Sequence, residues 1–196
     1  MPSGGQIFLG GARYLSSGGA GIVADLPIKP GYVIEPGAEV RQTSFSNVSV
    51  YSSLNSGSTA TVSLTGLAAF NDAFSASARV YYTRDYAQAA AYQTSSSYAE
   101  EFALVASFAP LLPNIPTQWS VSPYVKLLQT KFDAPNPYID NVTQHDHELQ
   151  AGLVIDTPLS AKISVVTNIQ FARVESNIPN YRLHDFSVLT GPTVRF

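Results

Sequence analysis

Apolar and polar residues alternate along most of this chain. In ISVVTNIQF, residues 163–171, the odd-numbered positions hold Ile, Val, Thr, Ile and Phe, whereas the even-numbered positions hold Ser, Val, Asn and Gln. A period of two is typical of a β-strand whose two faces meet different environments. The segment therefore predicts a strand with one apolar face and one face of small and amide side chains.

The same alternation recurs along the chain. It predicts eight strands, over about residues 32–43, 58–70, 74–85, 98–109, 118–131, 147–157, 161–174 and 182–196. The N-terminal part adds QIFLGGARYLS and GIVADLP, joined by the glycine-rich SSGGAG, whose GGAG at 18–21 we interpret as a turn. We favour ten strands in a single domain, residues 1–196, over eight strands with an N-terminal extension.

Short and long connections alternate between these strands. The short ones lie at residues 70–74, 111–117 and 157–162, and the long polar ones at 43–58, 83–97, 131–146 and 174–181. This alternation is typical of an up-and-down antiparallel barrel in an outer membrane, which has short periplasmic turns and long external loops. The three short connections are therefore expected on the periplasmic side.

Period-two strands also fit a soluble β-sandwich binding module, in which the apolar faces would point into a shared core. Two features favour the membrane barrel. The strands have about the length of a tilted membrane crossing, and aromatic residues stand near the ends of the apolar faces, as in interfacial girdles. These aromatics are Phe70, Phe74, Tyr82, Tyr98, Phe108, Trp119, Phe171 and Phe196.

The composition agrees with this all-β transmembrane barrel. Only 13% of the 196 residues are charged, although 45% are apolar, and a soluble sandwich normally needs more charge on its outer faces and edges. The formal net charge of −3 gives no basic footprint for nucleic acid. The chain has no cysteine, which excludes disulfides and thiolate chemistry. No signal peptide is visible after Met1, so we expect a mature or excised chain.

The chain ends in an amphipathic strand, HDFSVLTGPTVRF, with Phe196 last. The segment VESNIPNYRLHDFSVLTGPTVRF resembles the final hairpin of bacterial outer-membrane β-barrel modules that are joined to periplasmic repeat domains in envelope and surface-export proteins. The resemblance implies that Phe196 is the signal read by the barrel-assembly machinery. Gly191 and Pro192 depart from the bulky residues that are usual in such a strand.

The polar faces carry charges of both signs, which in a barrel would line the lumen. We expect these charges to pair, because isolated charges in a medium of low dielectric constant are costly. They form either a plug, which we favour, or the lining of a narrow pore. The candidates are Glu35, Glu39, Arg41, Arg79, Asp85, Glu101, Lys126, Glu148, Asp156, Asp185 and Arg195.

Catalytic chemistry has a weaker basis. QHDHEL places His145 and His147 two residues apart near a long loop, and such a pair is a weak candidate for metal binding. His147, beside two carboxylates and with His184 at a neighbouring loop, is the candidate base of a hydrolase at the barrel rim. No serine-containing nucleophile motif accompanies it. We expect no enzyme activity, no cofactor and no metal.

The sequence therefore predicts a small barrel in the outer membrane of a Gram-negative bacterium. We expect it to act as a membrane anchor or a porin-like narrow conduit for transport, within a larger envelope or export assembly. Its expected partners are outer-membrane lipid, the barrel-assembly machinery, and periplasmic or envelope proteins.

Overall fold

The computed structural model describes residues 2–9, 12–45, 56–110, 118–139, 141–160 and 162–194, and these residues are almost entirely β-strand. Two short 3₁₀ turns, η1 (Ala91–Gln93) and η2 (Pro179–Tyr181), precede β7 and β11. The strands are β1 (Pro2–Leu9), β2 (Ala12–Val23), β3 (Leu26–Lys29), β4 (Tyr32–Phe45), β5 (Gly57–Ala69), β6 (Phe74–Ala87), β7 (Ser95–Phe108), β8 (Trp119–Phe132), β9 (His145–Pro158), β10 (Ile163–Ser176) and β11 (Leu183–Val194).

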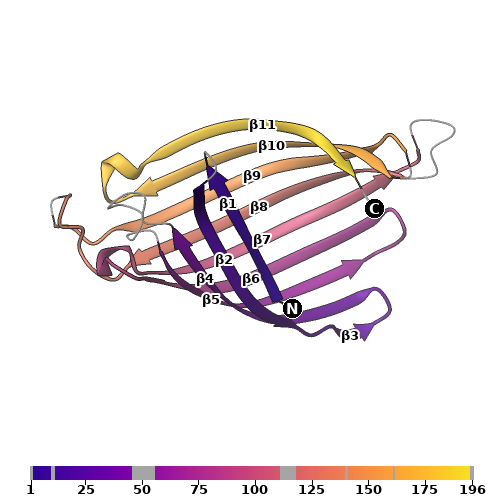
Figure 1. Ribbon diagram of the computed structural model, residues 1–196. Helices are drawn as coiled ribbons and strands as arrows, with labels where there is room; N and C mark the ends of the chain where they lie inside the picture. Colours follow the sequence, from indigo (N-terminus) through magenta and orange to yellow (C-terminus); the bar gives the residue numbers. More distant parts are fainter. Residues whose placement is uncertain are drawn as a thin grey trace.

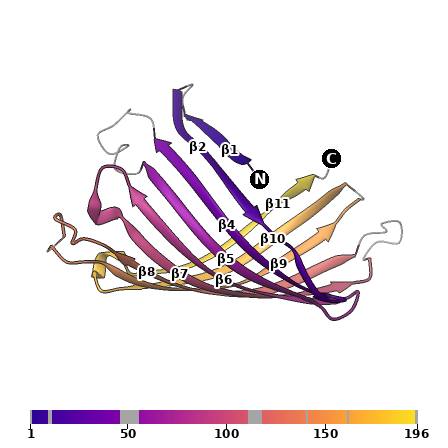
Figure 2. The ribbon, with the colours of Figure 1, turned by 90° about the horizontal axis from the view of Figure 1, so that it is seen from below.

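The strands form one antiparallel sheet in the order β1-β2-β4-β5-β6-β7-β8-β9-β10-β11, and the short β3 pairs with the start of β4 outside this path. The predicted all-β fold with ten up-and-down antiparallel strands is thereby confirmed. The sheet is strongly twisted and curled, with β1 and β11 at its two ends (Figures 1 and 2). In the described residues no register pairs β1 with β11, so closure of the barrel stays a prediction.

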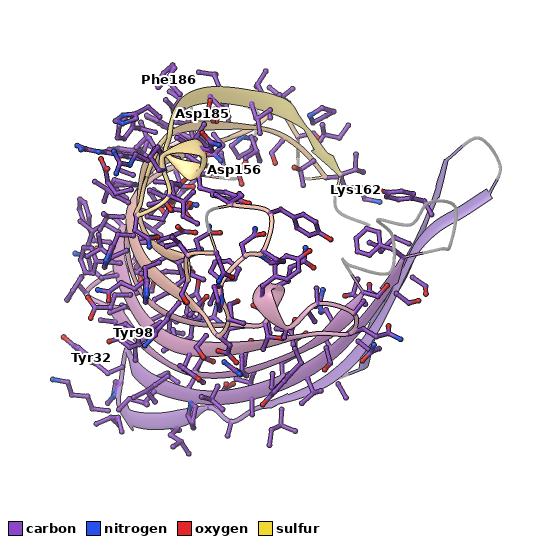
Figure 3. All side chains as sticks on the ribbon, turned by 90° about the vertical axis from the view of Figure 1, so that its left-hand side faces the viewer. Tyr32, Tyr98, Asp156, Lys162, Asp185 and Phe186 are labelled. Atoms are coloured by element: carbon purple, nitrogen blue, oxygen red, sulfur yellow. The ribbon has the colours of Figure 1, made fainter. Side chains whose placement is uncertain are left out.

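The curled sheet has a concave and a convex face, and the alternation of the sequence decides which residues lie on each. In Figure 3, Tyr32, Tyr98 and Phe186 point away from the enclosed space, whereas Asp156 and Asp185 point into it. Asp185 and Phe186 are neighbours in β11 and so take opposite faces. The polar phase of each strand is therefore the concave face.

Large apolar side chains do not gather in a core between sheets. Among the described residues the only buried apolar side chains are Ala90, Ala99, Ala172 and Ile178. Many large apolar side chains on the convex face are instead exposed, for example Val62, Phe102, Leu127 and Phe186. A β-sandwich needs two sheets packed over an apolar core, and the described chain has neither.

The convex face changes character along each strand. On β6 it runs through Phe74, Ala76, Ala78, Val80 and Tyr82 and then becomes polar at Arg84. On β9 it begins with His145 and His147 and is apolar from Leu149 to Ile155. The polar ends of all these strands lie beside the long connections. They form a polar collar above an apolar band.

Two of the predicted short connections are well defined. In the turn between β5 and β6, the side-chain oxygen of Asn71 accepts hydrogen bonds from the main-chain N–H groups of Ala73 and Phe74 at 2.8 and 2.9 Å. Between β9 and β10, Ser160 Oγ accepts from the N–H groups of Lys162 and Ile163 at 3.2 and 3.0 Å. The third, residues 111–117, lies outside the described residues.

The glycine-rich segment near the N-terminus was interpreted wrongly as a turn. Residues 17–21 lie inside β2, where residues 17–20 pair with both β1 and β4 and Gly21 pairs with β4. A Cβ atom at Gly19 would lie 2.6 Å from the carbonyl oxygen of Val40, so glycine allows a close approach of two backbones here.

No helix in the described residues has the length and apolar character needed to cross a membrane.

Candidate functional site: the polar interior

Ten of the eleven predicted lumen residues lie on the concave phase of their strands, from Glu35 on β4 to Asp185 on β11. The eleventh, Arg195, lies outside the described residues, as does Phe196, the predicted insertion signal. Figure 3 shows Asp156 and Asp185 directed into the enclosed space. The period-two pattern is thus sufficient to place these residues on one face, although it gives no heights along the strands.

Three of these charges form a row across neighbouring strands. The register places Arg79 of β6 opposite Glu101 of β7, and Glu101 opposite Lys126 of β8. Glu101 Oε2 lies 4.0 Å from Arg79 Nη1, and Glu101 Oε1 lies 3.8 Å from Lys126 Nζ. One carboxylate is therefore shared by two cations, which leaves the row with one net positive charge.

An aromatic ring extends this row. The Tyr81 ring centroid lies 4.9 Å from the Arg79 guanidinium carbon and 5.8 Å from Lys126 Nζ, within the range of cation–π attraction. A hollow of about 390 Å³ lies beside the row, and its lining includes Tyr124 and Gln150. The pairing therefore runs along the wall of the sheet, with open space next to it.

Hydroxyl groups form the other part of the interior. Thr61 and Thr83 are hydrogen bonded across β5 and β6 at 3.0 Å, and Ser97 and Thr130 across β7 and β8 at 2.9 Å. Thr59 donates to Asp85 at 2.6 Å. A hollow of about 300 Å³ lies at this end of the interior, beside Thr59 and Asp85. Such pairs stabilise a sheet across its strands and make the lining polar without adding charge.

Glu39 and Arg41 also interact, as two residues of the same phase on β4. Arg41 Nη2 lies 2.8 Å from Glu39 Oε1. Both side chains remain nearly half exposed, at 44% and 48%, so the pair is partly hydrated. An ion pair of this kind contributes little to stability, on the order of 0–1 kcal/mol.

The described concave face is acidic overall. It carries three basic side chains, Arg41, Arg79 and Lys126, against eight acidic ones, namely Glu35, Glu39, Asp85, Glu101, Asp146, Glu148, Asp156 and Asp185. The concave faces of β9, β10 and β11 hold four of these acids and no base. A concave surface with one dominant sign of charge concentrates ions of the opposite sign. The arrangement therefore favours cations.

The sequence analysis missed several interior groups. Asp146 is in phase with Glu148 and accepts a hydrogen bond from Gln144 at 2.6 Å, and the same period would have revealed it. The hydroxyl group of Tyr124 lies 3.4 Å from Asn168 Oδ1 and 3.2 Å from Gln170 Oε1, on β10. No sequence signal predicts the contacts of Tyr124 with β10, because β8 and β10 are not neighbours along the chain or in the sheet.

The histidines lie elsewhere. His145 and His147 are exposed and belong to the convex phase of β9, in the collar. His184 is on β11, and β10 separates it from this pair. The part of the chain that the structure describes contains no group of three or more His, Cys, Asp or Glu residues that could hold a metal ion. In that part, His147 makes no hydrogen bond or ion pair that would activate a nucleophile.

A comparison with models of known protein families and with curated proteins finds no match to this chain.

Proposed function

We propose that this chain is a small β-barrel of a bacterial outer membrane, acting as a membrane anchor or as a narrow conduit in a larger envelope or export assembly. One observation carries the proposal: the exposed convex face is apolar along a band, in which Glu100 of β7 is a charged exception, while the concave face is polar. In water so large an exposed apolar surface would drive aggregation. A lipid bilayer covers it.

The dimensions of the band support this interpretation. On β6 the apolar convex residues run from Phe74 to Tyr82. At about 3.3 Å per residue and a tilt of about 45°, this stretch covers roughly 20 Å of height between its first and last Cα atoms. Outer-membrane barrels have an apolar band about 25 Å tall, and side chains at the two ends supply the difference.

Aromatic residues stand at both borders of the band. At the end with short turns, the rings of Phe108 and Trp119 are stacked with their centroids 4.5 Å apart. At the other end, Tyr82 and Tyr98 are exposed at the edge of the polar collar that borders the apolar band. Amphipathic rings favour the boundary between lipid and headgroups, so the two rows are suited to the two surfaces of a bilayer.

The experiment that tests the proposal is reconstitution into phosphatidylcholine vesicles after refolding from urea. A membrane barrel requires detergent or vesicles to stay in solution, and its unheated form migrates on a gel differently from its heated form. A chain that stays monomeric in buffer without detergent and leaves vesicles unbound contradicts the proposal and favours the soluble binding module.

Whether the interior conducts is a second question for the same preparation. The ion-paired row runs along the wall, and hollows remain beside it, which supports a narrow conduit at least as much as a plug. The acidic interior favours cations. Conductance in planar bilayers decides between the two, because a plugged barrel gives no steady current.

A further inference from the structure

The polar collar contains one patch that is rich in hydrogen-bond donors. It lies on the convex face of β6 to β9 and surrounds a hollow of about 280 Å³. We define the collar patch as Tyr82, Tyr98, Gln129, Lys131, His145 and His147, all of which line this hollow. Tyr98 points away from the enclosed interior in Figure 3.

The register places the patch residues side by side on neighbouring strands. Tyr82, Tyr98, Gln129 and His147 are successive cross-strand partners, and one step further from the apolar band Lys131 is paired with His145. Side chains opposite each other on neighbouring strands lie about 5 Å apart at their Cβ atoms. An amine, imidazoles, an amide and phenols thus point from one side of the sheet toward a common space.

Three acidic side chains lie near the patch, and each already has a polar partner. Asp146, which also lines the hollow, accepts a hydrogen bond from Gln144 at 2.6 Å. Asp133 forms an ion pair with Arg84, whose Nη1 lies 2.7 Å from Asp133 Oδ1. Glu100 accepts a hydrogen bond from the Tyr98 hydroxyl at 2.9 Å. Within the described residues Lys131 makes no ion pair of its own. The charge of Lys131 contributes to the lowered pKa of Asp133, but no close ion pair with a described residue holds its amine. The patch therefore offers a cation together with several donors, which suits an anionic oxygen-rich group.

We propose that the collar patch binds the phosphate headgroup of an anionic membrane lipid. This inference rests on the proposed function, because it requires the apolar band to lie in a bilayer. Lys131 supplies the charge, and His145, His147 and Gln129 supply donors to the phosphate oxygens. The two tyrosines lie at the level where headgroup and acyl chain meet.

The position of the patch favours a lipid over a free phosphate. One step along the strands from Gln129 and His147, the convex residues are Leu127 and Leu149, which are paired and belong to the apolar band. A ligand seated in the hollow thus has donors around its head and an apolar surface below it. Free phosphate can use the donors, but it has no acyl chain to contact the apolar surface.

The test compares lipids bound to the purified barrel by native mass spectrometry. The probes are phosphatidic acid and phosphatidylcholine with the same acyl chains, each added to the barrel in an uncharged detergent, and inorganic phosphate as competitor. The variant is Lys131→Gln combined with His145→Gln. The matched control is Lys162→Gln, which removes an exposed lysine in the turn between β9 and β10, at the opposite end of the sheet.

We expect the wild-type barrel to retain phosphatidic acid at least about tenfold more tightly than phosphatidylcholine, a difference of about 1.4 kcal/mol. The preference should disappear in the double variant and persist in the control. Equal retention of the two lipids, or an unchanged preference in the double variant, overturns the inference. So does displacement by inorganic phosphate at the lipid's own concentration, which would show a simple phosphate site.

The outcome is separable from the test of membrane insertion. Each variant is first checked for its unheated gel form and for insertion into phosphatidylcholine vesicles. A wild-type chain that inserts but shows no lipid preference contradicts only the headgroup site. A wild-type chain that inserts into no vesicle contradicts the proposed function itself.

Discussion

The ring of Tyr124 lies directly over Gly152 on the concave face. The two residues are cross-strand partners on β8 and β9, and a Cβ atom at Gly152 would meet the Tyr124 ring at 2.5 Å. The missing side chain lets the ring pass over β9, so that its hydroxyl group reaches Asn168 and Gln170 on β10. One side chain thereby ties three strands together.

Gly152→Ala should therefore destabilise the sheet. The new methyl group displaces the ring, and the contacts of the hydroxyl group with β10 are lost. Overpacking of this kind costs about 1–3 kcal/mol. The free energy of unfolding in urea, measured in the same detergent for wild type and variant, checks the prediction.

Gly66→Ala is the matched control. Gly66 is on the convex face of β5, where an added Cβ atom would lie 3.9 Å from the carbonyl oxygen of Ala78, its nearest neighbour. Its substitution should leave the stability unchanged within about 0.5 kcal/mol. If both variants lost the same stability, the cause would be a general effect of replacing glycine in a strand. The contact with the Tyr124 ring would then not explain the effect at Gly152.

A second prediction concerns the convex face. Leu64→Arg and Leu104→Arg place a charge in the proposed lipid-facing band, which costs about 2–4 kcal/mol near the middle of a bilayer. Ser63→Arg and Ala103→Arg change the neighbouring concave positions, where water and carboxylates are available. Unfolding in vesicles should show a clear difference between the two pairs. Equal effects would contradict the assignment of the convex face to lipid.

The contrast between β2 and the later strands shows what the sequence can predict. In β4 to β11 apolar and polar residues alternate within each strand. The local sequence is therefore enough to assign the residues of the strand to the two faces of the sheet. In β2 the residues SSGGAG have few side chains, and the local pattern resembles a turn. Only the pairing with β4, where Gly19 lies against the backbone at Val40, explains why glycine occupies a strand.

The interior site was likewise predictable only in part. The phase of Arg79, Glu101 and Lys126 follows from alternation within each strand, so their common face was predictable. Their common height depends on register, which the connections between strands set. The contact of Tyr124 with Gln170 also crosses an intervening strand. No pairwise pattern in the sequence indicates it.

A third prediction concerns pH. The Arg84 guanidinium holds the pKa of Asp133 below its ordinary value, through a side-chain hydrogen bond first and charge attraction second. A lowered folded-state pKa means that the ion pair stabilises the folded state fully above the ordinary value of about 3.8. The stabilisation is then lost as the pH falls through the lower folded-state value.

Asp133→Asn should accordingly reduce the stability of the folded chain at pH 6 and have a smaller effect at pH 3. The thermal midpoint of unfolding in detergent at the two pH values measures this. Because the pair is exposed, its effect should also fade at high salt. A difference between wild type and Asp133→Asn that grows toward low pH would contradict the sign of this linkage.

The last prediction concerns ion flow. If the interior is a narrow conduit, its excess of carboxylates should make the wild-type current small and selective for cations. Lys126→Gln and Arg79→Gln each remove one of the two cations that share Glu101. Each substitution should raise the preference for cations, because it increases the negative charge of the lining. Reversal potentials across a salt gradient in planar bilayers measure this preference.

Arg173→Gln is the control, because Arg173 lies on the convex face of β10, where it donates a hydrogen bond to Glu175 at 2.7 Å. Its loss should leave the reversal potential unchanged. A wild-type barrel without steady current, in which neutralising Arg79 or Lys126 opens a cation current, would identify a plug held by the shared carboxylate. Large, stable and unselective wild-type channels would contradict both the plug and the narrow conduit, since neither the paired row nor the acidic wall would then control what passes.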